Sequence, residues 1–295
     1  MKLRHDTLQV HGLTISFQRT LRIPNDGRDW PLPPGLGCFP VRQVDDYRKT
    51  VPKAWREHGG VFLPMYQREA MWLSFSGGPH AIKVGVGKQC AVTGKKWKDA
   101  LRTKKQDYLV SPPQPWLDGI CVGDGRIRQF VAMPLGSGVT VEGQLTGKEE
   151  HGGLQLSVMP PKPGVFDPPS TTRSRRRCAP PSPAGAPMMM ECAQESEMGL
   201  AAGGSMVQKI YPDPHGHGVW DQKRGERVFV HLCNSQMWTR ITGEPAPSSP
   251  VSAARYKAAG LPWFDVYDEH LSTLKGTNKL KGVKALVDSV RDGLW

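Results

Sequence analysis

The sequence lacks long apolar runs. In its 295 residues, no stretch approaches the roughly 18 consecutive apolar residues that a membrane-spanning helix needs. Residues 1–6 carry charge and are not followed by the apolar run of about 7–15 residues that a secretory signal contains. These absences predict a soluble protein without a transmembrane segment, and we expect a cytoplasmic location.

Cysteine is sparse and has no pairing pattern. The six cysteines are scattered, and no two of them form a Cys-x-x-Cys arrangement. Disulfide frameworks and zinc ribbons use closely spaced cysteines in defined patterns. We therefore expect reduced thiols, and we expect Cys121 and Cys233, which stand in apolar runs, to be small core residues.

Catalytic and nucleotide-binding motifs are also lacking. The chain contains neither Gly-x4-Gly-Lys-Ser/Thr nor Gly-x-Gly-x-x-Gly, so no motif supports an NTPase or a dinucleotide-binding protein. A Gly-x-Ser-x-Gly turn is missing as well. The sequence therefore leaves open whether the protein is an enzyme, and it identifies no catalytic residue and no cofactor.

Positive charge is what the sequence has in excess. It contains 39 Lys and Arg against 27 Asp and Glu, a formal net charge of +12. Such an excess attracts nucleic acids, anionic membranes and acidic proteins in a salt-dependent way, although a solvated basic surface has the same composition. The densest segment is residues 83–105, with eight basic residues and one acidic residue.

This basic segment predicts a surface for an anionic partner, either a nucleic acid or an acidic protein. Basic side chains neutralise phosphates, and aromatic rings such as that of Trp97 stack on bases. The predicted ligand-binding or anion-binding residues are Lys83, Lys88, Lys95, Lys96, Trp97, Lys98, Trp116 and Trp263. We expect a non-enzymatic binding or assembly protein.

Six features of residues 59–118 recur later in the same order, which predicts an internal duplication. Gly59-Gly60, Tyr66, Trp72, the apolar run 82–84, Thr93-Gly94 and Pro115-Trp116 correspond to Gly203-Gly204, Tyr211, Trp220, the apolar run 228–230, Thr242-Gly243 and Pro262-Trp263. The repeated Pro-Trp-x-Asp could line a groove between two related halves. Burial of the ring with an Asp that caps a turn is the favoured explanation.

The predicted fold class is α+β, mostly antiparallel strands with short helices, in two internally related lobes. Residues 1–159 would form the N-terminal lobe, and residues 198–295 the C-terminal lobe with a terminal amphipathic helix whose apolar residues stand three and four apart. Residues 160–197, rich in Pro and Arg, would be a flexible linker because they hold few large aliphatic side chains. Paired lobes could also support a homo-oligomer.

Local signals predict three smaller elements. Gly123-Asp124-Gly125 stands between two apolar runs, which is typical of a hairpin. Thr140 and Asn234 can cap short helices, and a glycine follows each helix, at Gly147 and Gly243.

Two pairs of residues support an alternative, a metal-dependent or hydrolase-like enzyme. His215 and His217 could share a metal ion with a nearby aspartate, although a Pro- and Gly-rich loop often carries exposed histidines. His231 and Cys233 would lie on one side of a strand, as a base and a nucleophile could. A buried histidine beside an apolar cysteine explains the second pair more simply.

Four segments of the chain resemble a family of hypothetical proteins from bacteria and fungi. They are residues 128–136, 151–155, 211–214 and 260–265, and the likeness extends over nearly the whole chain outside the linker. No activity is assigned to that family. The resemblance therefore implies a stand-alone soluble protein and no catalytic residues.

Overall fold

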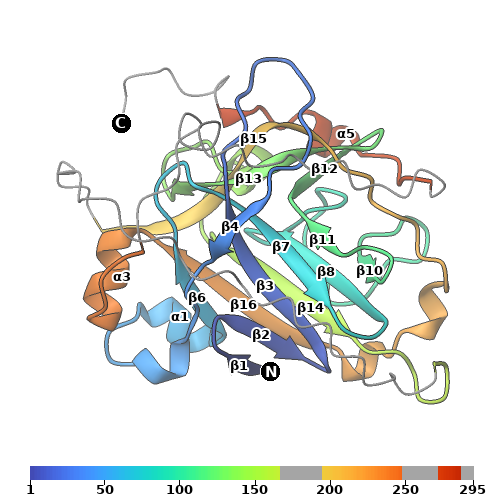
Figure 1. The fold of residues 1–295 in the computed structure, drawn as a ribbon, viewed down its shortest axis with the longest axis horizontal. Coiled ribbons are helices and arrows are strands. Elements are labelled where there is room, and N and C mark those ends of the chain that lie inside the picture. Colours follow the sequence, from blue (N-terminus) through green and yellow to red (C-terminus); the bar gives the residue numbers. More distant parts are fainter. Residues whose placement is uncertain (167–194, 248–271, 287–295) are drawn as a thin grey trace.

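The computed structural model describes residues 1–166, 195–247 and 272–286. These residues form one large sheet of 16 strands with few, short helices (Figure 1). The predicted predominance of antiparallel strands with short helices is confirmed. None of the helices in these ranges is long and apolar enough to cross a membrane.

Many of the strands are short, as the many turn-forming glycines and prolines suggest, and the longest has 11 residues. In chain order they are β1 (Lys2–Arg4), β2 (Thr7–Val10), β3 (Leu13–Thr20), β4 (Gly35–Cys38), β5 (Arg42–Gln43), β6 (Val61–Pro64), β7 (Ala70–Ser76), β8 (His80–Val86), β9 (Gln89–Cys90), β10 (Leu109–Ser111), β11 (Trp116–Leu117), β12 (Gly119–Gly123), β13 (Arg126–Pro134), β14 (Leu154–Met159), β15 (Glu197–Val207) and β16 (Glu226–Cys233).

The helices have one or two turns each. The α-helices are α1 (Lys53–His58), α2 (Val141–Thr146), α3 (Ser235–Thr242) and α5 (Asn278–Lys281), and the 3-10 helices are η1 (Val44–Tyr47), η2 (His217–Val219) and η3 (Gln222–Arg224). The predicted caps are confirmed. The side chain of Thr140 accepts a hydrogen bond from Gly143 N, and that of Asn234 accepts one from Met237 N. Gly147 and Gly243 end these helices in the left-handed conformation.

The main path through the sheet is β1-β2-β3-β7-β13-β15-β16-β14-β8-β10. Neighbours on this path are antiparallel, whereas β6 runs parallel to β16 off the path. The predicted hairpin is confirmed, since β12 pairs with β13 around residues with positive φ, among them Asp124.

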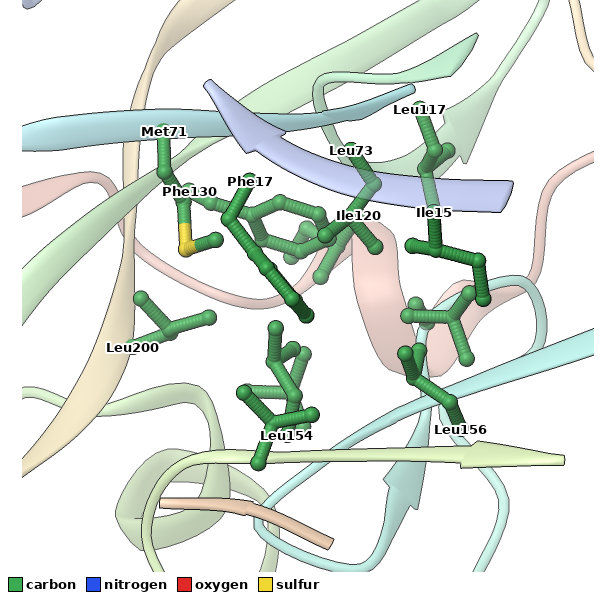
Figure 2. Close-up of a cluster of buried hydrophobic side chains, with 14 of the residues drawn as sticks. Ile15, Phe17, Met71, Leu73, Leu117, Ile120, Phe130, Leu154, Leu156 and Leu200 are labelled. Atoms are coloured by element: carbon green, nitrogen blue, oxygen red, sulfur yellow. The ribbon is translucent and has the colours of Figure 1, made fainter. Parts of the chain in front are cut away.

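The core lies between two layers of this curved sheet. Figure 2 shows Phe17, Leu73 and Phe130, from β3, β7 and β13, facing Leu154 and Leu156 of β14. All five side chains are buried in one hydrophobic cluster. A smaller cluster, which includes Trp55, Phe62, Cys233 and Trp238, packs α1 and α3 against the pair of β6 and β16 at one side of the sheet (Figure 1).

Strands from both predicted lobes share the one sheet. The apolar runs 82–84 and 228–230 of the predicted repeat lie in β8 and β16, which flank β14 on its two sides. Other matched features lie in unlike elements: Gly60 precedes β6, whereas Gly204 lies inside β15. Because Pro262 and Trp263 fall outside the described residues, the two-lobe division stays a prediction.

Two expectations need correction. The terminal amphipathic helix is not continuous in residues 272–286, because α5 ends at Lys281 and Ala285 forms a β-bridge with Ala202. The six cysteines are not all reduced. Cys90, Cys121 and Cys233 are free, but Cys38 is disulfide-bonded.

Candidate anion-binding surface

Lys83, predicted as part of the surface, is instead a buried residue of β8. It anchors the part of the basic segment that follows β8, up to residue 105, which we call the basic loop. The side chain of Lys83 is 0% exposed. Its Nζ donates hydrogen bonds to Lys98 O at 2.5 Å, to Ala100 O at 2.7 Å and to Asp107 Oδ2 at 3.0 Å. A buried ammonium needs such partners because removing it from water is costly. Lys83 therefore cannot meet a ligand directly, and it fixes the loop that carries the other lysines.

Asp107 completes this anchor. Its Oδ1 accepts a hydrogen bond from Arg102 N at 3.0 Å, and its Oδ2 lies 3.3 Å from Arg102 Nε. Lys83 and Asp107 thus hold the middle of the charged run, at Lys98, Ala100 and Arg102. Exposed lysines stand along the same loop, at Lys95, Lys96, Lys98, Lys104 and Lys105.

A second basic segment, residues 272–286, packs against this loop. Thr277 Oγ1 donates to Thr93 O at 2.8 Å, and Lys105 Nζ donates to Gly276 O at 3.3 Å. Leu280 lies so close to Gly94 that a Cβ added there would be 2.9 Å from Leu280 Cγ. The second segment contains four lysines and no acidic residue. Folding therefore joins two lysine-rich segments that are far apart in the sequence.

Few acidic side chains neutralise these lysines. Asp99 lies 3.3 Å from Arg227, and Asp124 lies 3.2 Å from Lys281. Within the described residues, eight exposed lysines of the two segments form no ion pair within 4.0 Å. They are Lys95, Lys96, Lys98, Lys104, Lys105, Lys275, Lys279 and Lys284, and we call them the lysine surface.

Trp97 lies between Lys96 and Lys98 of the lysine surface. The half-buried indole covers Gly85, where an added Cβ would be 2.6 Å from the ring. Its ring centroid is 5.2 Å from Lys83 Nζ, and its Nε1 donates to Asp99 Oδ1 at 2.8 Å. The backbone N of Trp97 donates to Lys88 O at 2.9 Å. Lys88 and Trp97 therefore lie next to each other beside the lysine surface, and their part in ligand binding stays a prediction.

The two Pro-Trp positions do not join this site in the described residues. Trp116 pairs with Ser74 of β7, and its ring meets Trp72 edge-on at 6.4 Å between centroids. No hydrogen bond, ion pair or ring contact recorded for the described chain links it to the lysine surface. Trp263 lies outside the described residues.

His215 and His217 lie in a loop whose aspartate is already engaged. Asp213 Oδ1 accepts from His215 N at 2.8 Å, and Asp213 Oδ2 accepts from Tyr108 Oη and from Trp220 Nε1. The His215 ring packs edge-on against Phe166 at 4.8 Å. In the described part of the chain, no three His, Cys, Asp or Glu side chains are grouped as a metal site requires.

His231 and Cys233 share one face of β16, as their spacing predicted, but each has its own backbone partner. His231 Nε2 lies 3.0 Å from Gly59 O, and Cys233 Sγ donates to Leu63 O at 3.6 Å. Burial lowers the pKa of His231 to about 4 and raises the pKa of the Cys233 thiol. A protonated thiol is a weak nucleophile, so this geometry suits the core interpretation. An enzymatic role stays an untested prediction.

The sequence reasoning missed an aromatic and cationic row along β16. Arg227 Cζ lies 4.5 Å from the Phe229 ring centroid and 5.9 Å from that of Trp97. Phe229 lies parallel to His231 at 6.2 Å, and His231 stacks on Trp55 at 4.7 Å. We call Trp97, Arg227, Phe229, His231 and Trp55 the aromatic row. The alternation of Arg227, Phe229 and His231 on a strand was the signal that could have found it.

The chain matches no family model, no curated protein and no solved structure. The resemblance to a family of hypothetical proteins therefore stays a prediction.

Proposed function

We propose that the protein is a non-enzymatic binding protein that holds an anionic polymer on its lysine surface. The observation that carries the proposal is the joining of two lysine-rich segments, through Thr277 and Lys105, with little neutralising acid beside them. Clustered exposed cations raise the local concentration of anions and speed their association. The net charge of +12 has the same sign and supports long-range attraction.

The anchoring of the loop is a second support. Lys83 and Asp107 hold the loop from within the sheet, so its lysines are displayed from a fixed backbone. A pre-organised loop loses less conformational entropy on binding than a free one, and this saving favours affinity. A basic surface that is only solvated does not require a fixed backbone. It would therefore not require the buried ion pair of Lys83 and Asp107 that fixes this loop.

Charge reversal on each of the two segments tests the proposal. We expect Lys96→Glu combined with Lys279→Glu to weaken binding of fluorescently labelled heparin at least tenfold, measured by anisotropy. The matched control is Lys2→Glu with Lys162→Glu, two exposed lysines elsewhere that give the same change of charge. The control should stay within about threefold of the unmodified protein. Equal weakening in both variants would show that net charge alone attracts the polymer, and the surface would be rejected.

We also propose an internal duplication, an oligomeric assembly and a cytoplasmic location as separate points. The duplication is supported by the equivalent places of β8 and β16 beside β14.

Light scattering tests the assembly: a mass near that of the 32.6 kDa chain would contradict it.

A further inference from the structure

We propose that the anionic partner is a single-stranded nucleic acid, whose bases stack along the aromatic row while its phosphates meet the lysine surface. This inference rests on the proposed function and specifies the class of polymer. The row and the lysine surface share the loop of Trp97, so a strand held by one reaches the other.

The row has the chemistry of a stacking platform. Trp97 and Phe229 are half-buried, and Arg227 and His58 are exposed. The His58 ring lies 4.6 Å from that of Phe229, which widens the row on its solvent side. A guanidinium held on an aromatic ring is itself a planar surface on which a base can stack. His231 and Trp55, which are buried, form the base of the row and hold it rigid.

The spacing of the row follows from its strand. Side chains two residues apart on one face of β16 repeat about every 6.7 Å, which places Arg227, Phe229 and His231 in a line. Arg227 and Phe229 of this line reach solvent and can meet unstacked bases, whereas His231 is buried beneath them. Such stacking tolerates any sequence because every base has a π face. The inference is therefore for binding without strong sequence preference.

Basic groups flank both ends of the row. Trp97 adjoins the lysine surface at one end. At the other end, helix α1 supplies Trp55 and His58, and it borders a shallow hollow of about 600 Å³. The hollow is lined by Arg48, Lys49, Lys53, Arg56 and Glu57. Arg48 pairs with Asp45, and Lys53 pairs with Glu57. Lys49 and Arg56, which form no ion pair in the described residues, therefore supply the positive charge that can neutralise phosphates at this end of the row.

The planar groups of the row that reach solvent, Trp97, Arg227 and Phe229, favour a single strand over the other polyanions. The bases of a duplex stack on each other, so their faces are closed to protein side chains, whereas unpaired bases can stack on aromatic and guanidinium planes. An acidic protein would meet the lysines but would gain little from planar groups. Neither alternative uses Arg227 and Phe229 as stacking partners.

The test compares a labelled oligothymidylate with its duplex, with polyglutamate and with heparin, by fluorescence anisotropy. The first variant, Arg227→Lys, keeps the charge and removes the planar group. The second, Phe229→Leu, keeps an apolar side chain and removes the ring. We expect each variant to weaken oligothymidylate binding about tenfold, within the range for loss of one stacking contact. Heparin binding should stay within about twofold.

The remaining outcomes distinguish a failure of this inference from a failure of the proposed function. If both variants bind oligothymidylate as the unmodified protein does, or if the duplex or polyglutamate binds more tightly than the single strand, the inference is overturned while the proposed function stands. If the unmodified protein binds none of the four polymers, the proposed function fails with it. If Phe229→Leu does not fold, as judged by circular dichroism, the test depends on Arg227→Lys alone, because Arg227 is exposed and its substitution leaves the core unchanged.

Discussion

The ammonium of Lys83 lies 5.2 Å from the ring centroid of Trp97, with the cation fully buried and the ring half-exposed above it. This contact joins the core of the sheet to the candidate binding surface. The same ammonium holds two carbonyl groups of the loop and the carboxylate of Asp107. A single buried side chain therefore holds the basic loop at Lys98 and Ala100 and joins it to Asp107.

Replacing Lys83 by Met should destabilise the protein by about 3–5 kcal/mol. The substitution leaves Asp107 buried with only Arg102 as an ionic partner, and breaking a buried pair from one side has a cost of this size. Urea unfolding measures the change. Lys95→Met, at an exposed position of the same loop, should stay within about 0.5 kcal/mol. Equal effects in the two variants would show that Lys83 does not anchor the loop.

Gly60 is required where β6 meets β16. Its φ is +89°, and an added Cβ would lie 2.2 Å from Phe229 O, a backbone atom that cannot move without breaking the strand. We expect Gly60→Ala to destabilise the fold by more than about 3 kcal/mol. The neighbouring Gly59 has φ +65° but no atom within 4 Å of an added Cβ. Gly59→Ala should therefore cost only the backbone strain, about 1–3 kcal/mol. A reversed order of the two variants in urea unfolding would contradict this account.

Local chemistry made part of this fold predictable. The caps at Thr140 and Asn234 and the turn at Asp124 depend only on residues near them in the chain. The alternation along β16 was also visible, but without the sheet order nothing indicated that Arg227 would lie beside Trp97. Strand pairing over long separations decides such contacts.

The environment of Lys83 could not be read from the sequence. It stands among apolar residues in a basic segment, and both a surface and a buried position fit that pattern. Its burial depends on Asp107 and on two loop carbonyls, which only the folded chain brings to it. The sequence also does not indicate that residues 272–286 pack on the loop. That packing depends on hydrogen bonds between residues far apart in the chain, such as the one from Thr277 to Thr93 O.

Asp118 should give the stability a specific pH dependence. Burial raises its pKa to about 7, and the hydrogen bond from Gln208 Nε2 at 2.6 Å offsets only part of this effect. Since an unfolded Asp has a pKa of about 3.9, the folded state binds the proton more tightly. The ionised form is disfavoured in the fold, so this contribution to stability falls as the pH rises from about 4 to about 7.

The variant Asp118→Asn removes this ionisation and keeps an acceptor for Gln208. Its free energy of unfolding relative to the unmodified protein should rise by up to about 4 kcal/mol between pH 4 and pH 7. Urea unfolding of both proteins across this range measures the difference. A difference that does not change with pH would show that the carboxyl group is not held in a raised-pKa environment.

The salt dependence of binding tests the central claim, that lysines of two distant segments act as one surface. For a single-stranded polymer, the slope of log Kobs against log salt concentration is about −0.7 per phosphate neutralised. We predict that Lys96→Gln and Lys279→Gln each reduce the magnitude of the slope for oligothymidylate by about 0.7, and that the double variant reduces it by about 1.4. A slope that Lys279→Gln leaves unchanged would contradict the claim, because the second segment would then take no part in binding.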